Sequence, residues 1–252
     1  MASLFSLTGQ TALVTGASRG LGQAIAVALA EAGAKVICAS SSSEGSRDTV
    51  AKITAAGGHA TVLAADLSDE TAVEQLAEQA LAQGPVDILV NCGGTIFRAP
   101  AHQFPMQEWH KVIAVNLDSA FLLSQRLGAE MIKRKSGKII NIASMLSYSG
   151  GITVPAYTAS KHAIAGLTKA LANEWAQHNI QVNAIAPGYF RTDNTAALQA
   201  DTERNAAITA RIPAARWGEP EDLAGAAVFL ASNASNYVNG HVLAVDGGWL
   251  AR

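Results

Sequence analysis

The sequence predicts an α/β fold, with a doubly wound parallel sheet of about seven strands and helices on both faces. Short apolar runs alternate with longer stretches of helical pattern along the 252 residues. The apolar runs are continuous, which is typical of strands buried on both faces of a parallel sheet. No linker rich in Pro, Gly or Ser divides the chain, so we expect residues 1–252 to form a single domain.

The expected elements alternate between strand and helix, an order that implies right-handed crossovers. The strands are expected at 11–15, 35–39, 61–65, 86–90, 138–144, 181–185 and 241–245. The helices are expected up to about 32 and at 50–56, 70–83, 108–134 and 157–177. Gly33 ends the first helix, because glycine readily adopts the left-handed conformation that closes a helix. Ligands of such sheets bind beyond the carboxyl ends of the strands.

Composition excludes several classes of protein. Lys and Arg number 18 against 20 Asp and Glu, so the basic surplus of a nucleic-acid binder is absent. No apolar run approaches the roughly 20 residues that span a membrane, and residues 1–10 show no secretory pattern. The two cysteines, Cys38 and Cys92, suit a reducing compartment. We therefore expect a cytoplasmic protein without a nucleic-acid or membrane partner, and the sequence suggests no metal site.

A glycine-rich stretch at 15–22, Thr-Gly-Ala-Ser-Arg-Gly-Leu-Gly, joins the first strand to the first helix. Gly16, Gly20 and Gly22 permit a tight turn, and the following helix N-terminus offers free N–H groups to a pyrophosphate. The stretch follows a strand and opens an apolar helix, which is the context that a dinucleotide fingerprint requires. Its position predicts a Rossmann-type nucleotide site.

The end of the second strand bears on the choice of nicotinamide cofactor. An acidic residue there would bind the ribose hydroxyls of NAD, but the chain has serines at 40–43 and no acid before Glu44. Arg19 in the glycine-rich stretch could meet the 2′-phosphate of NADP. The hydroxyls of Ser40 and Ser41 together with Arg19 favour NADP(H), while a solvated Arg19 would leave NAD(H) open.

A tyrosine and a lysine open the helix expected at 157–177. Tyr157 and Lys161 are four residues apart and therefore share one face. A free tyrosine has a pKa near 10, and a neighbouring ammonium favours the phenolate. Ser144 ends the fifth strand, where its hydroxyl could bind a substrate oxygen. Asn116 places an amide inside an apolar helical stretch, where it needs polar partners.

Together these residues resemble the short-chain dehydrogenase/reductase family over essentially the whole chain. The matching motifs are the stretch 15–22, Asp66-Leu67, Asn-Cys-Gly-Gly at 91–94, Asn116, Ser144, the Tyr157/Lys161 pair and Pro187-Gly188. The resemblance implies that Tyr157 is the general acid/base and that Ser144 positions the reacting oxygen. It also implies that Lys161 binds the nicotinamide ribose and lowers the pKa of Tyr157, and that Asn116 holds a water in a proton relay.

The same resemblance implies a set of cofactor contacts. They are Gly16, Ser18, Arg19, Gly20, Leu21, Gly22, Ser40, Ser41, Asp66, Leu67, Asn91, Gly93, Tyr157, Lys161, Pro187, Gly188 and Thr192. The chain departs from the family at Cys92, where an asparagine is usual. The departure removes an amide that stabilises the central sheet, and we expect Cys92 to be a buried thiol.

The C-terminal half resembles the branch of the family that acts on deoxy sugar acids of the 2-deoxygluconate type. We therefore expect a substrate site that includes Ser144 and Tyr157, with Arg98 and Arg191 as candidate cations for a carboxylate and His102 and Arg216 as further ones. The segment 192–213 is polar and helical, as expected for a lid. Reduction of a 3-oxoacyl thioester is an alternative activity, and a non-catalytic nucleotide sensor is a second alternative.

Charged residues make up only 15 % of the chain, and 50 residues are alanine. A monomer of this size would carry more charge, so the composition indicates surface that is buried on assembly. Relatives of this kind are usually tetramers. We expect a homotetramer in which the helix of Asn116, the helix of Tyr157 and the tail 242–252 are covered.

Overall fold

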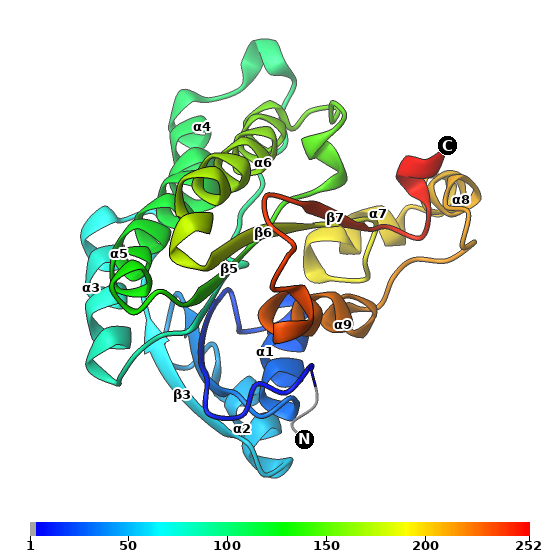
Figure 1. The fold of residues 1–252 in the computed structure, drawn as a ribbon. Coiled ribbons are helices and arrows are strands. Elements are labelled where there is room, and N and C mark those ends of the chain that lie inside the picture. The colour runs from blue at the N-terminus through cyan, green and yellow to red at the C-terminus, as the bar shows by residue number, and fades with distance from the viewer. Residues whose placement is uncertain (1–3) are drawn as a thin grey trace.

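The computed structural model describes residues 4–252 and contains one seven-stranded parallel sheet with the order β3-β2-β1-β4-β5-β6-β7 (Figure 1). The strands are β1 (Thr11–Thr15), β2 (Lys35–Ser40), β3 (His59–Ala64), β4 (Ile88–Asn91), β5 (Gly137–Ile142), β6 (Ile180–Pro187) and β7 (Val242–Val245). The expected class and all seven expected strands are confirmed. Residues 1–3, which belong to the expected domain 1–252 and to the stretch 1–10, lie outside the described residues.

Successive residues of a strand point to opposite faces of the sheet, so a continuous apolar run makes both faces apolar. Helices cover both of these faces. The helices are α1 (Gly20–Glu31), α2 (Arg47–Ala55), α3 (Glu70–Ala82), α4 (Met106–Ile113), α5 (Ser119–Arg134), α6 (Pro155–Trp175), α7 (Ala196–Ala200), α8 (Thr202–Arg211) and α9 (Pro220–Ala231). Val14 of β1 packs into a core shared with α1, α2 and α9. Leu13, one residue earlier, packs into a second core with α3, α5 and α6.

The edges of the sheet differ from the expected pattern of burial on both faces. No residue of the edge strand β3 is fully buried, and β7 at the other edge has one buried residue, Val242. The five inner strands are almost wholly buried. A continuous apolar sequence therefore predicts the inner strands well. An edge strand has a neighbouring strand on one side only, so it remains partly exposed to solvent.

Two helices depart from the expected elements. The stretch expected as one helix over 108–134 is divided into α4 and α5 by a π-helical turn, Ala114–Asp118. The buried helix α9 was not expected, although it has a recognisable start. Pro220 stands in its first turn, and Glu219 with Asp222 forms a capping box. Together these features are a signal for a helix N-terminus.

The order of the sheet reverses at β1, which pairs with β2 on one side and β4 on the other. In doubly wound sheets, ligands bind beyond the carboxyl ends of the strands at such a reversal. The segments that follow β1, β2, β4, β5 and β6 therefore all start at this one edge. The expected glycine-rich stretch, serine run, Asn-Cys-Gly-Gly motif and Ser144 are all found there.

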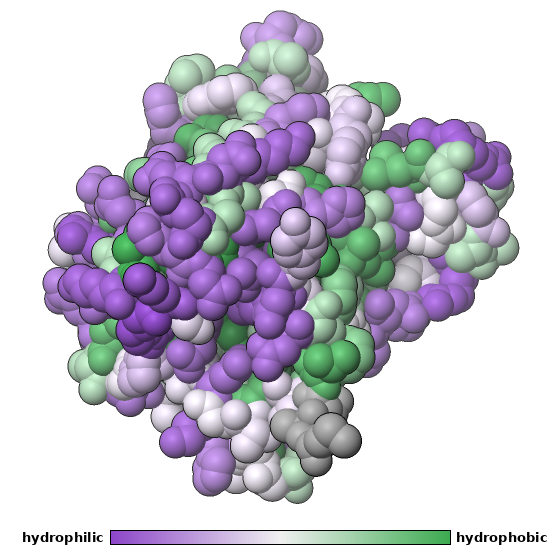
Figure 2. All heavy atoms as spheres, in the orientation of Figure 1, coloured by the Kyte–Doolittle hydropathy of each residue, from purple (hydrophilic) through white to green (hydrophobic). Residues whose placement is uncertain are grey.

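The surface combines polar and apolar regions. Figure 2 shows hydrophilic residues over α3 and the neighbouring part of α5, with apolar patches nearer β7 and α9. Large apolar side chains at the surface include Phe121 of α5 and Leu250 near the C-terminus. Within residues 4–252, every helix is too short or too polar to cross the hydrocarbon core of a bilayer.

A close contact between α5 and α6 leads to a stability prediction. A Cβ at Gly128 of α5 would meet the Trp175 ring of α6 at 2.8 Å, whereas one at Gly225 of α9 would have open space. We expect Gly128→Ala to lower the free energy of unfolding by about 1–3 kcal/mol through overpacking. Gly225→Ala, the matched control, should raise it by up to about 1 kcal/mol. Urea denaturation measures both, and a neutral Gly128→Ala would contradict this account of the contact.

Candidate active site

Tyr157 and Lys161 lie in the first two turns of α6, at the carboxyl edge of the sheet. The helix starts with Pro155, whose fixed φ suits a first helical position. The Lys161 side chain is buried and donates a 2.6 Å hydrogen bond from Nζ to the carbonyl of Ile142, at the end of β5. Its Nζ lies 5.4 Å from the centre of the Tyr157 ring. The expected pair therefore occupies one site.

Ser144 follows β5 and caps a short 3₁₀ turn, where its Oγ accepts a hydrogen bond from the N–H of Leu146. Burial raises the pKa of Tyr157, while the hydrogen bond of the Ser144 side chain to the phenol lowers it. A weaker contribution from Cys92 raises the Tyr157 pKa, and the charge of Arg98 lowers it. Ser144 and Arg98 therefore both favour the phenolate.

The expected action of Lys161 on Tyr157 stays a prediction. The ammonium donates to the Ile142 carbonyl, and the neighbours that lower the Tyr157 pKa are Ser144 and Arg98. Burial also lowers the pKa of Lys161 to about 8.

Asn116 lies in the π-helical turn and uses its whole amide in hydrogen bonds. Its Oδ1 accepts from the N–H of Thr95 at 2.7 Å, and its Nδ2 donates to the Thr95 carbonyl at 3.0 Å and to Ser160 Oγ at 3.1 Å. The side chain joins the loop after β4 to the helix that carries Tyr157. Its expected role in holding a water stays a prediction.

Arg98 lies on that loop with an exposed side chain whose charge reaches Tyr157. The next residue, Ala99, donates its N–H to the carbonyl of Thr153 at 3.0 Å, just before α6 begins. Asn116 and Ala99 thus attach the Arg98 loop to α6 at two points. Arg98 is a cation close to the reacting group, as expected for a substrate contact.

Cys92, the departure from the family motif, is a partly buried thiol. Burial raises its pKa to about 11, so the thiol is protonated at neutral pH. The sheet-stabilising amide is its neighbour Asn91, whose Nδ2 donates to Asn141 Oδ1 at 2.8 Å. The Nδ2 of Asn91 is therefore committed to the sheet, whereas its buried Oδ1 has no hydrogen-bond partner among residues 4–252. Its expected support of a cofactor stays a prediction.

The glycine-rich loop brings main chain against main chain. A Cβ at Gly22 would lie 2.1 Å from the carbonyl oxygen of Gly16, and one at Gly16 would lie 2.9 Å from the Cα of Gly93. Gly16 and Gly20 also have positive φ. Leu21 lies in the first turn of α1. This close approach leaves the helix N-terminus open to a phosphate, as the fingerprint requires.

The neighbourhood of the loop fits a phosphorylated adenosine. Ser40 is the last residue of β2 and Ser41 follows it, and Asp66 and Leu67 follow β3 at the same edge. Leu67 packs against Gly93, whereas Asp66 accepts hydrogen bonds from Ser68, which lower its pKa. The serine run carries hydroxyls without a carboxylate, so the residues present fit NADP.

Arg19 makes an exposed ion pair with Asp193, in which the Nε of Arg19 lies 3.1 Å from the Oδ2 of Asp193. Asp193 belongs to the segment after β6. Its neighbour Thr192 faces Gly20, since a Cβ at Gly20 would lie 3.4 Å from the Cγ2 of Thr192. The glycine-rich loop and the start of the lid therefore lie together. Pro187 ends β6 and pairs with Val245, and Gly188 follows it beside Asp246.

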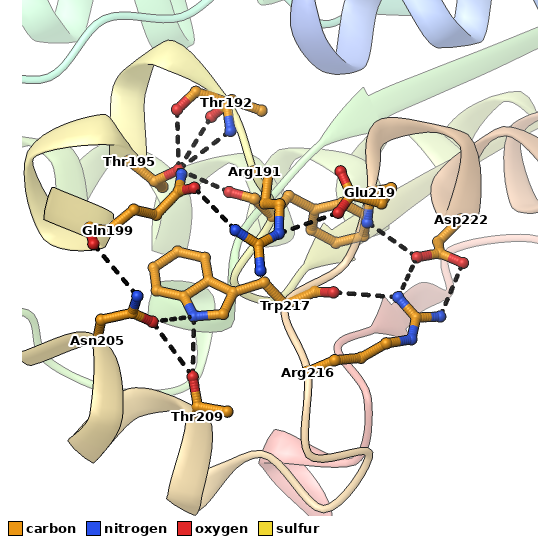
Figure 3. A network of polar contacts seen from close by, with 11 residues as sticks. Arg191, Thr192, Thr195, Gln199, Asn205, Thr209, Arg216, Trp217, Glu219 and Asp222 are labelled. Atoms are coloured by element: carbon orange, nitrogen blue, oxygen red, sulfur yellow. Dashed lines mark hydrogen bonds and ion pairs between the residues drawn. The ribbon is translucent and has the colours of Figure 1, made fainter. Parts of the chain in front are cut away.

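The segment expected as a lid, 192–213, is held by a polar network around Trp217, shown in Figure 3. The buried indole donates from Nε1 to Asn205 Oδ1 at 2.9 Å and to Thr209 Oγ1 at 3.1 Å, both on α8. Asn205 donates to the carbonyl of Gln199 on α7, and Gln199 donates to Thr195 Oγ1. The segment expected to be helical over 192–213 is thus two short helices with a defined anchor.

Two of the arginines that were expected to bind a substrate carboxylate form ion pairs in this network. Arg191 pairs with Glu219 at 3.0 Å and donates to Gln199 Oε1, and Arg216 pairs with Asp222 through two nitrogens (Figure 3). The role of Arg191 as a substrate cation stays a prediction, because an exposed ion pair of this kind is weak. Sequence alone could not reveal these pairs, because their acids lie on a segment that folds back.

A cavity of about 200 Å³ lies beyond the ends of β6 and β7, lined by residues that include Tyr189, Arg216 and Asp246. None of Asn116, Ser144, Tyr157 and Lys161 lines it, so it is separate from the catalytic group. Among residues 4–252 no cluster of His, Cys, Asp and Glu is arranged to hold a metal ion.

Sequence reasoning missed Thr95 and Ser160, the two partners of Asn116. Ser160 stands in the motif Tyr-x-x-Ser-Lys, so its position three residues after Tyr157 was a usable signal. Thr95 acts through its main chain, which no residue pattern reveals. Sequence reasoning also did not identify Trp217, whose indole holds the segment 192–213 in place.

Comparisons with known proteins agree with this geometry. Residues 16–250 match the family model described as enoyl-(acyl carrier protein) reductase. A Bacillus subtilis (strain 168) protein named 2-dehydro-3-deoxy-D-gluconate 5-dehydrogenase is 55 % identical over 98 % of this chain and 97 % of its own.

Two crystal structures are also similar. One is a candidate NAD(P)-dependent gluconate 5-dehydrogenase from Beutenbergia cavernae with NADP at low occupancy, 53 % identical with a TM-score of 0.97 over 99 % of this chain and 100 % of that one. The other is a candidate 2-deoxy-D-gluconate 3-dehydrogenase from Agrobacterium tumefaciens with bound NADP, 52 % identical with a TM-score of 0.94 over the same shares. With its whole length matched and its motifs gathered at one edge of the sheet, the chain belongs to the short-chain dehydrogenase/reductase family.

Proposed function

We propose that this protein is an NADP-dependent oxidoreductase that interconverts a secondary alcohol and a ketone on a deoxy sugar acid of the 2-deoxygluconate type. The observation that carries the proposal is that the Ser144 hydroxyl and the positive charge of Arg98 both act on Tyr157 and lower its pKa. Such a site can bind a reacting oxygen and a carboxylate of one small molecule. The relatives described above are named for sugar acids of this kind.

NADP, when bound, supplies or accepts the hydride. We assign its adenosine end to the glycine-rich loop, Arg19, Ser40, Ser41, Asp66 and Leu67. We assign its nicotinamide end to Lys161, Pro187, Gly188 and Thr192, with Gly93 between the two ends. The absence of an acid at the end of β2, together with the NADP in two related structures, supports NADP(H) over NAD(H).

Tyr157 holds the proton that enters or leaves the substrate oxygen, and the Ser144 hydroxyl positions that oxygen beside it. During oxidation the alcohol proton passes to the phenolate, and during reduction the phenol returns it. Burial opposes the phenolate, whereas Ser144 and Arg98 favour it. We assign further support to the Lys161 ammonium, whose Nζ lies 5.4 Å from the centre of the ring. Asn116 keeps the loop of Arg98 and the helix of Tyr157 in fixed relation.

The carboxylate of the substrate is assigned to Arg98. An arginine can bind a carboxylate through two parallel hydrogen bonds, which orients as well as attracts it. In contrast to Arg191 and Arg216, it has no acidic partner in residues 4–252. Its charge also acts on Tyr157, so binding and proton transfer share one cation.

We also propose that residues 1–252 form one nucleotide-binding domain that assembles as a homotetramer in the cytoplasm. The low charge of the chain and the surface position of Phe121 and Leu250 support the assembly. The two free cysteines support the reducing compartment.

Replacement of Tyr157 by Phe tests the chemistry. We expect Tyr157→Phe to lower kcat with 2-deoxy-D-gluconate or 2-dehydro-3-deoxy-D-gluconate by about 10²- to 10⁴-fold, because the proton donor is lost. The control Tyr237→Phe changes a fully exposed tyrosine and should keep full activity. The assay includes neutral sugars and acyl thioesters with both cofactors. Turnover confined to acyl thioesters, or an active Tyr157→Phe enzyme, would contradict the proposed function.

Replacement of Arg98 by Gln tests the substrate class. Its charge lowers the pKa of Tyr157, so Arg98→Gln should raise that pKa and move the acidic limb of the pH profile for oxidation to higher pH. The KM for the sugar acid should rise by about ten-fold or more, with little change for a neutral sugar. Arg98→Lys should restore part of the pH shift, and Arg126→Gln, on α5, is the control. An unchanged KM and profile would remove Arg98 from the site.

Light scattering after size-exclusion chromatography tests the assembly. We expect a mass near four times 26.0 kDa. Phe121→Glu should reduce that mass, because burying an unpaired charge in an interface is costly, while Ile152→Glu should leave it unchanged. A wild-type monomer would be inconsistent with the proposed tetramer.

A further inference from the structure

Helix α2 is attached to both segments that surround the expected 2′-phosphate of the cofactor. One segment is the glycine-rich loop at Ser18 and Arg19, and the other is the serine run that begins at Ser40. The helix contacts the first through the buried Thr49 and the second through Ser46, the residue before its first turn. Figure 1 shows α2 beside α1, whose N-terminal turn carries Gln23.

Thr49 donates a 2.6 Å hydrogen bond from Oγ1 to the carbonyl of Ala17, and both residues are fully buried. Gln23 adds a second fixed point. Its Nε2 donates to Thr49 Oγ1 at 2.9 Å and to the Ser18 carbonyl at 3.4 Å. Lys52 donates to Gln23 Oε1 at 2.7 Å, which leaves the amide nitrogen facing the loop.

These bonds set the direction of two N–H groups, because a peptide unit is planar and trans. The carbonyl of Ala17 and the N–H of Ser18 belong to one unit and point in opposite directions. The carbonyl of Ser18 and the N–H of Arg19 are related in the same way. Among residues 4–252, neither N–H donates to a protein acceptor. Thr49 and Gln23 therefore hold both N–H groups toward the ligand side of the loop.

The second segment is held by the same helix. Ser46 is fully buried and donates from Oγ to Ser40 Oγ at 2.8 Å, and Ser40 donates to the carbonyl of Ser42 at 2.8 Å. The N–H of Ala17 also donates to the carbonyl of Ala39, beside the serine run. The spacing between Ser18–Arg19 and Ser40 is therefore set through α2.

We propose that Thr49 and Gln23 are positioning residues for recognition of the 2′-phosphate of NADP(H). They act through the Ala17 and Ser18 carbonyls and make no contact with the phosphate themselves. The inference rests on the NADP assignment of the proposed function. It predicts that loss of the Thr49 hydroxyl weakens binding of a 2′-phosphorylated adenosine much more than binding of an unphosphorylated one.

The test uses the purified full chain and calorimetric titration with 2′,5′-ADP and with 5′-AMP, neither of which requires turnover. Thr49→Val keeps the shape of the side chain and removes its hydroxyl. We expect the Kd for 2′,5′-ADP to rise about ten-fold and the Kd for 5′-AMP to change less than about three-fold. Gln23→Met, at a partly exposed position, should give a smaller shift in the same direction.

Two control variants separate positioning from packing. Thr49→Ser retains the hydroxyl and should restore 2′,5′-ADP binding to within about two-fold of wild type. Thr54→Val removes an exposed hydroxyl of α2 that bonds only the Val50 carbonyl of its own helix, and it should have no effect. Circular dichroism confirms that each variant is folded at the temperature of titration.

The outcomes distinguish this inference from the cofactor assignment. A wild-type protein that binds both nucleotides equally would overturn the NADP assignment and the positioning role together. A wild-type preference for 2′,5′-ADP that survives Thr49→Val and Gln23→Met would overturn the positioning role alone. An equal loss of both nucleotides in Thr49→Val would also overturn it, because it would indicate a general effect on the loop.

Discussion

The parallel direction of all seven strands is the constraint on which the rest of the molecule depends. It places the carboxyl ends of β1, β2, β4, β5 and β6 at one edge, so that segments far apart in sequence meet there. The amide of Asn116 then joins two of them, the loop of Arg98 and the helix of Tyr157. The sheet brings these segments together, and a few buried hydrogen bonds fix their positions relative to one another.

The sequence was sufficient for features that local pattern determines. Continuous apolar runs identify the inner strands, and the stretch 15–22 is recognisable because glycine permits contacts that a Cβ would block. It was insufficient where tertiary partners decide the role of a residue. Arg191 is a cation in a plausible place, but Glu219 occupies it. Lys161 stands beside Tyr157 as expected, yet its ammonium is directed to a main-chain carbonyl.

The site combines a buried Lys161 and a partly buried Tyr157 with few compensating charges. Burial disfavours the charged form of both Tyr157 and Lys161, which raises the pKa of one and lowers that of the other. A hydrophobic environment of this kind excludes water and strengthens every remaining electrostatic interaction. Perturbed groups beside an open crevice are typical of functional sites, whereas the buried Cys38 with its raised pKa lies in the apolar core.

The reversal of strand order at β1 also affects how the chain folds. Thr11 at the start of β1 hydrogen-bonds Asp87, 76 residues further along, just before β4. Until β4 has been synthesised, the edge of β1 that later pairs with β4 has no hydrogen-bonding partner strand. Closing a loop of this length costs entropy before its contacts form, and non-local pairing of this kind slows folding in general. We therefore expect the two halves of the sheet to come together late, and we expect the unpaired edge of β1 to be a point at which aggregation competes with folding.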